Sequence, residues 1–147
     1  MNCNSDVNER FRKSVLVSID DVGQIIDTAN EESLLLGRDI YQSGTALELY
    51  ESYHQIKRKG LYRADASVVF VPKESGAVTV RMLLDGRELP SSRVHLSVEK
   101  DKYYTIASCV PAFDRIMSLT LNPRLELTIA GVSGFVARTM LSTTKLA

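Results

Sequence analysis

Apolar and polar residues alternate along the stretch from Gly60 to Leu89, and turn-forming residues interrupt the alternation twice. Successive side chains of an extended strand point to opposite faces, so the alternation predicts one buried face. Its first part consists of Tyr62, Ala64, Ala66, Val68 and Phe70. After a break at 72–76 it resumes with Val78, Val80, Met82 and Leu84. The stretch is typical of three consecutive strands in a sheet meander.

The two interruptions have the chemistry of turns. Pro72 has no backbone donor for a strand ladder, and Gly76 accepts a positive φ, so strand pairing is expected to stop between them. Asp85-Gly86 is the strongest hairpin signal of the chain, because both residue types tolerate the positive φ of a tight hairpin turn.

The remaining chain contains further short strand patterns. Strands are expected at 14–19, 32–37, 45–50, 93–99, 103–110, 124–129 and 135–142. Pro111 is expected to end the ladder of its strand, and the turn at 131–134 is expected to close a hairpin. Residues 143–147 are expected to form a short tail, and 38–44 a connection or a short paired strand.

Two segments fit more than one structure. Residues 21–30 fit a helical turn, but Gly23 and the β-branched Ile25 and Ile26 favour strand and loop. Residues 47–57 alternate like a strand, but they also carry an apolar stripe at helical spacing. Together the patterns give about eight to ten short strands with regular turn signals, which indicates an all-β sandwich or barrel, with an immunoglobulin-like sandwich as one alternative.

Several of these positions resemble a known family. The matching residues are Gly60, Tyr62, Asp65, Ala66, Ser67, Val68 and Phe70, then Asp85 and Gly86, then Gly131, Val132 and Gly134. Over roughly Val15 to Leu146 the chain resembles the tumour-necrosis-factor-like jelly roll, the fold of the globular head of complement, and is most similar to small bacteriophage virion proteins. The resemblance implies an antiparallel double-sheet jelly-roll sandwich whose copies form trimers on a phage head, as decoration or short head fibres.

Length, composition and charge limit the number of domains and the classes of partner, independently of the resemblance. A chain of 147 residues with 44% hydrophobic content buries one core, so residues 14–147 are expected to form one domain, preceded by a short extended arm at 1–13. The formal net charge is zero, which argues against nucleic acid or an anionic membrane as a partner. No segment approaches the ~18 apolar residues of a membrane span, so synthesis in the host cytoplasm is expected.

No catalytic or cofactor-binding pattern stands out, so the protein is expected to have no cofactor and no enzymatic activity. Cys3 and Cys109 are expected to be free thiols, with Cys109 a small buried apolar residue. His54 and His95 lack a third group at a recognisable spacing and are interpreted as structural. Asp20-Asp21 is the nearest approach to a cation site, but hard cations need more oxygen ligands than this segment offers, and no metal is expected.

The polar arm suggests an attachment site. We expect Arg10, Phe11, Arg12 and Lys13 to hold the protein on a major capsid protein or another head protein, which would place it on the virion. A homotrimer is expected because strands at 67–71 and 78–84 are apolar on both faces over part of their length. The basic run 57–59 is interpreted as a solvated loop tip. The alternative function is a receptor- or glycan-binding module, with exposed aromatics at Tyr41, Tyr50 and Tyr53.

Overall fold

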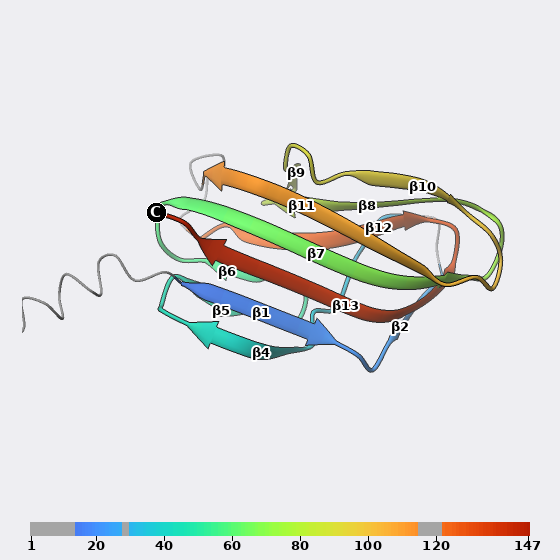
Figure 1. Cartoon of the computed structure of the whole chain (residues 1–147), viewed down its shortest axis with the longest axis horizontal. Helices are drawn as coiled ribbons and strands as arrows, with labels where there is room; N and C mark the ends of the chain where they lie inside the picture. Colours follow the sequence, from blue (N-terminus) through green and yellow to red (C-terminus); the bar gives the residue numbers. More distant parts are fainter. Residues whose placement is uncertain (1–13, 28–29, 115–121) are drawn as a thin grey trace, which may run out of the picture.

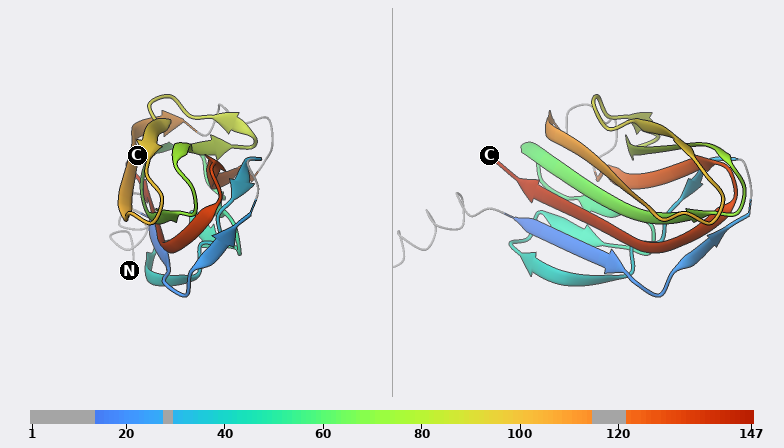
Figure 2. Two further views of the ribbon diagram at one scale, coloured as in Figure 1. Left: turned by 90° about the vertical axis from the view of Figure 1, so that its right-hand side faces the viewer. Right: turned by 45° about the vertical axis from the view of Figure 1, so that its right-hand side comes forward.

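The computed structural model describes residues 14–27, 30–114 and 122–147, and within these ranges the chain forms thirteen strands and no helix. The strands build two antiparallel sheets that stack face to face, as Figure 1 and both views of Figure 2 show. The predicted all-β double-sheet sandwich is therefore confirmed, with more strands than the eight to ten expected. The excess arises because several strands have only two or three residues.

Sheet A contains the longest strands of the molecule. Its order is β11 (Tyr104–Asp114), β7 (Leu61–Pro72), β13 (Gly134–Lys145), β1 (Val15–Asp20) and β4 (Arg38–Ser43), and β2 (Gln24–Ile26) pairs with the start of β13. Sheet B has the order β10 (Val94–Val98), β8 (Gly76–Leu84), β12 (Arg124–Gly131), β6 (His54–Ile56) and β5 (Leu47–Leu49), with β3 (Glu32–Ser33) on β12 and β9 (Arg87–Glu88) on β8.

The core lies between the two sheets and consists of the inward half of each alternating strand. In β7 every second residue is buried, from Tyr62 to Phe70, as the alternation predicts. The largest fully buried side chains are Tyr62, Phe70, Leu16, Leu34, Leu36, Ile56, Met82, Leu84, Leu89, Leu125, Leu127 and Ile129. They come from both sheets, so neither sheet buries its inner face without the other.

Two predicted connections are wrong. β7 and β8 do not form a meander, because β7 belongs to sheet A and β8 to sheet B. The turn at 131–134 likewise does not close a hairpin, since β12 pairs with β8 and β13 pairs with β7 and β1. Both turns carry the chain from one sheet to the other. Alternation reports which face of a strand is buried and not which strand lies beside it.

The hairpin at Asp85-Gly86 is confirmed. Leu84 pairs with Arg87 across it, and Asp85 and Gly86 have φ angles of 49° and 80°. Pro111, in contrast, does not end its strand, because β11 continues to Asp114. The register shifts between Val110 and Phe113, so the proline sits in a bulge of an edge strand, where no ladder donor is needed.

The ambiguous segments also resolve as strands. Gln24–Ile26 is the short β2, and residues 38–43 form β4, which pairs with β1. The helix alternative at 47–57 is wrong, because that segment is the β5–β6 hairpin. The strand expected at 32–37 is limited to β3, and the expected tail at 143–147 is mostly strand, since β13 extends to Lys145.

Candidate functional site

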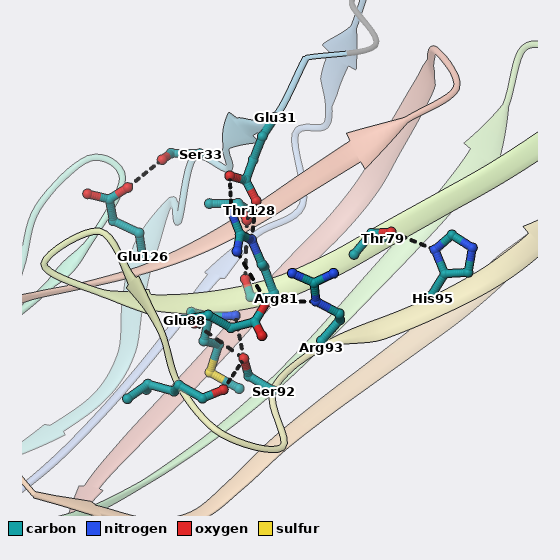
Figure 3. Close-up of polar contacts among 12 residues, drawn as sticks. Glu31, Ser33, Thr79, Arg81, Glu88, Ser92, Arg93, His95, Glu126 and Thr128 are labelled. Atoms are coloured by element: carbon teal, nitrogen blue, oxygen red, sulfur yellow. Dashed lines mark hydrogen bonds and ion pairs between the residues drawn. The ribbon is translucent and has the colours of Figure 1, made fainter.

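The outer face of sheet B is a polar surface whose charges neutralise one another (Figure 3). The Arg81 guanidinium donates to both carboxylate oxygens of Glu31, at 2.5 and 2.6 Å, and to Glu88 at 3.2 Å. Arg93 donates to the same oxygen of Glu88 at 2.7 Å. Thr128 donates to Glu31 at 2.8 Å. These contacts join β8, β9 and β12 with the residues before β3 and β10 on one solvated face.

The acids of this network are held in their charged form. The hydrogen bond from Arg81 lowers the pKa of Glu31, and the hydrogen bond from Arg93 lowers the pKa of Glu88. On the same face His95 bonds to Thr79 at 2.7 Å, and Ser33 donates to Glu126 at 2.7 Å (Figure 3). Polar groups that satisfy one another in this way form a stable water-facing surface rather than a reactive centre.

The outer face of sheet A is different because apolar side chains run across it. Val17 and Ile19 of β1 point outward and are half-buried, and Ile19 pairs with Met140 of β13. Tyr41 of β4 pairs with Val17 and is 58% exposed. Toward the other end Phe135 pairs with Val71 and is 44% exposed. These outward apolar side chains of sheet A are what we call face A, defined by Val17, Ile19, Tyr41, Val69, Val71, Phe135 and Met140.

A groove lies at the end of face A where β2 meets β13. Its volume is about 350 Å³, and its apolar lining comes from β2, the end of β7 and the start of β13. Its lining residues are Ile25, Ile26, Asp27, Val71, Pro72, Lys73, Asp101, Gly134 and Phe135. Gly23 leaves room for the ring of Phe135, because a Cβ at Gly23 would overlap that ring. The groove extends face A toward the end of the molecule opposite Ser14.

A buried histidine bridges the two sheets. His54 of β6 bonds through Nε2 to Ser18 Oγ of β1 at 2.7 Å and through Nδ1 to Thr143 Oγ1 of β13 at 2.8 Å. All three side chains are inaccessible to solvent. Burial lowers the pKa of His54 to about 3, so the ring is neutral. A serine beside a histidine has the geometry of a nucleophile and base, but no substrate reaches this pair, and the structural interpretation of His54 is confirmed.

Cys109 is a free thiol, as predicted, but it is not buried in the core. Its neighbours Ser108 and Val110 point inward, so Cys109 lies half-exposed on the outer side of β11. There Arg63 donates to Asp65 at 2.9 Å and to the Cys109 sulfur at 3.7 Å. The hydrogen bond with Asp65 raises the pKa of the Cys109 thiol, which disfavours the nucleophilic thiolate form. Cys3 lies outside the described residues.

The other candidate residues are not brought together. Asp21 pairs with Arg38 at 3.4 Å, and Asp20 is buried and accepts a bond from Gln24 at 3.3 Å. Among the described residues no group of three or more His, Cys, Asp or Glu side chains is arranged to hold a metal. No helix of the described chain is long and apolar enough to cross a membrane.

The tyrosines proposed for a glycan surface are also separated. Tyr50 stacks on Tyr53, with ring centroids 4.8 Å apart, and Arg124 lies over the Tyr53 ring at 4.7 Å. Tyr41 lies instead on face A, in the other sheet. A sugar that stacks on aromatic faces would therefore find only Tyr50 with a free face in this stack.

The arm residues Arg10, Phe11, Arg12 and Lys13 lie outside the described part of the chain, so the structure does not test them. The sequence interpretation placed the surplus apolar surface partly on 78–84, but Thr79 and Arg81 occupy the outward positions of β8. The sequence interpretation did not include β1, β4 and β13, whose outward side chains contribute to the exposed apolar surface. The uninterrupted apolar runs at 15–17 and 68–72 were the available signal, since a strand buried on both faces reads as a continuous apolar run.

Comparisons with known proteins place the fold. No protein-family model and no curated protein sequence match the chain. Among solved structures, murine APRIL superposes with a TM-score of 0.68 at 17% identity, over 92% of this chain and 100% of that one. PRD1 vertex protein P5 has a TM-score of 0.62 at 14% identity, over 90% and 95%.

The globular domain of zebrafish complement 1qA protein has a TM-score of 0.60 at 7% identity, over 91% of this chain and 98% of that one. These identities show the fold alone. The expected tumour-necrosis-factor-like jelly roll is confirmed.

Proposed function

We propose that the protein is a non-enzymatic structural protein of a bacteriophage virion, a homotrimer that lies on the capsid surface as decoration or as a short head fibre. The observation that carries the proposal is face A, a set of exposed and half-buried apolar side chains on the outer side of sheet A, where the outer side of sheet B carries paired charges. The fold shared with PRD1 vertex protein P5 supports the viral setting. The partner is the major capsid protein or another head protein.

The contrast between the two outer faces indicates how copies would pack. Face A leaves Tyr41 and Phe135 in water in a monomer, and exposed apolar surface of this kind marks an interaction site. The outer face of sheet B has its charges paired and gains nothing from being covered. Around a three-fold axis, face A of each copy therefore points inward and sheet B outward.

Attachment to the capsid is assigned to the arm. Arg10, Phe11, Arg12 and Lys13 combine one aromatic anchor with three cations, which suits a shallow pocket with acidic surroundings. Ser14, where the described chain begins, accepts a hydrogen bond on its backbone oxygen from Lys145 N at the end of β13, so the arm starts at one end of the folded domain. Three arms in a trimer bind together and reinforce weak individual contacts.

The alternative, a receptor- or glycan-binding module, is less well supported by the geometry. Tyr41 belongs to face A and would be covered in the trimer, and both ring faces of Tyr53 are occupied by Tyr50 and Arg124. The only serine–histidine pair of the described residues is sealed in the core, which favours a role without catalysis.

The mass of the protein in solution tests the trimer. Light scattering at micromolar concentration is expected to give three times the 16.3 kDa of one chain. Tyr41→Glu places a charge on face A and is expected to shift the protein toward monomer, because burying an unpaired carboxylate is costly. The matched variant His95→Glu puts the same charge on the outer face of sheet B and is expected to leave the trimer intact.

A wild-type monomer, or equal effects of the two variants, would reject the proposed packing. Circular dichroism of both variants distinguishes loss of assembly from loss of folding.

A further inference from the structure

Residues that are far apart in the sequence meet at the end of the sandwich where the arm begins. Lys145 N donates to Ser14 O at 2.8 Å, and Ala46 N donates to Ser14 Oγ at 3.1 Å. Lys57 N in turn donates to Ala46 O at 2.7 Å. The start of β1, the end of β6 and the end of β13 are thus tied together, and Figure 1 shows the starts of β1 and β7 at the same end as the C-terminus.

The turn that follows β6 contains three consecutive cationic residues and lies beside the side chain of Lys145. At Gly60, φ is 150°, and a Cβ there would lie 2.9 Å from Lys145 Cε and 3.1 Å from its Nζ, besides overlapping Ala147 O. The ammonium of Lys145 therefore lies directly beside the turn formed by Lys57, Arg58 and Lys59. Tyr62 donates its hydroxyl to Arg58 O at 2.5 Å, which holds the turn in place.

Most of this positive charge is not neutralised. Lys57 pairs with Glu48 at 3.5 Å. Arg58, Lys59 and Lys145 form no ion pair with another residue of the described chain, and Arg58 and Lys59 are exposed. The sequence alone makes 57–59 an ordinary solvated loop, but the fold adds Lys145 as a fourth cation and places the group at the same end as Ser14, where the described chain begins.

We infer that this basic end, defined by Lys57, Arg58, Lys59 and Lys145, is a docking surface for an acidic surface of another protein. The inference rests on the proposed function and deepens it: the folded domain, and not the arm alone, recognises the head protein. Rotation about a three-fold axis leaves the height of each copy unchanged, so a trimer presents its three basic ends at one level. Charges gathered in this way orient the protein and speed its association.

An acidic protein surface fits the basic end better than nucleic acid does. The chain as a whole has no net charge, and Arg81 and Arg93 on the outer face of sheet B are already paired with Glu31 and Glu88. A duplex or a single strand needs a longer track of cations along its phosphates, and single strands also need exposed aromatics to stack on. The basic end supplies a compact cluster instead.

Binding of the full chain to immobilised poly-L-glutamate at low ionic strength tests the inference. Wild type is expected to bind, and Arg58→Glu with Lys59→Glu is expected to weaken binding by about tenfold or more, with the remaining binding lost as salt screens the charges. The control is Lys73→Glu with Lys100→Glu, which makes the same change in charge at the opposite end. We expect that control to stay within about twofold of wild type.

Three results would overturn the inference: no wild-type binding, equal losses in the two variants, or tighter binding of wild type to double-stranded DNA than to poly-L-glutamate at the same salt. The mass by light scattering is recorded for every variant. A trimer that attaches to heads but fails the polyglutamate assay rejects the docking surface and leaves the proposed function standing. A monomer rejects the proposed trimer independently of the polyglutamate result.

Discussion

At the scale of single residues, His54 combines complete burial with a titratable ring. Its two nitrogens bond to hydroxyl groups of Ser18 and Thr143, and no carboxylate is among these partners to stabilise a positive charge. Burial therefore penalises the protonated form alone, which is why the pKa falls to about 3 from 6.5. The neutral histidine joins the two sheets through these hydrogen bonds. A charged ring at this position would be costly, because it would be buried without an opposite charge beside it.

This geometry predicts a loss of stability in acid. The unfolded chain binds a proton at His54 below pH 6.5, and the folded chain does not until about pH 3, so the free energy of unfolding falls as the pH drops through this window. The expected slope is about 1.4 kcal/mol per pH unit, or about 2 kcal/mol between about pH 7.5 and about pH 5. Urea unfolding at both pH values measures it.

The matched controls for this slope are two glutamine variants. His54→Gln removes the titrating ring and is expected to flatten the dependence, whereas His95→Gln changes an exposed histidine and is expected to keep it. A wild-type slope that survives in His54→Gln would show that other groups cause the acid sensitivity.

At the scale of elements, the turns between strands depend on glycine for two separate reasons. Gly86 has a φ of 80°, and a Cβ there would meet nothing within 4 Å. Gly131 has a φ of 127°, and a Cβ there would overlap the backbone oxygen of Ala77 in the neighbouring β8. Gly86 is needed only for the positive φ of the hairpin. Gly131 is needed also because the chain passes close to the backbone of β8 where it leaves β12 and crosses to the other sheet.

Alanine substitutions should separate these two roles. Gly86→Ala is expected to cost about 1 kcal/mol, the penalty of a left-handed backbone for a residue with a side chain. Gly131→Ala adds a clash with rigid backbone and is expected to cost several times more, at least about 3 kcal/mol. Thermal unfolding of both variants measures the difference, and equal costs would mean that the backbone of β8 yields to the added methyl group.

At the scale of the whole molecule, the sandwich presents three different surfaces: apolar face A, the paired charges outside sheet B, and the basic end where the arm begins. A trimer built through face A directs all three arms from one end, because the axis relates equivalent points at equal height. Each arm then needs to contribute only a weak contact for the assembly to bind tightly.

Deleting residues 2–13 tests whether the arm attaches the protein to the capsid. The truncated protein is expected to fold and to keep the trimer mass, since face A lies wholly within the described domain, but to lose binding to purified heads. Co-sedimentation with heads, alongside light scattering, measures both properties. Undiminished head binding would show that the folded domain alone attaches the protein.

The sequence determined the inward half of the strands and the tightest hairpin, because burial alternates with a period of two and because Asp-Gly tolerates positive φ locally. It also indicated the all-β class, because short strand patterns recur between regular turn signals. Tertiary structure alone decided that β7 and β8 lie in different sheets, that Cys109 points outward, and that Lys145 meets the turn at 57–60. These outcomes depend on contacts between residues that are distant along the chain, and a periodic pattern specifies the face of a strand without specifying its neighbours.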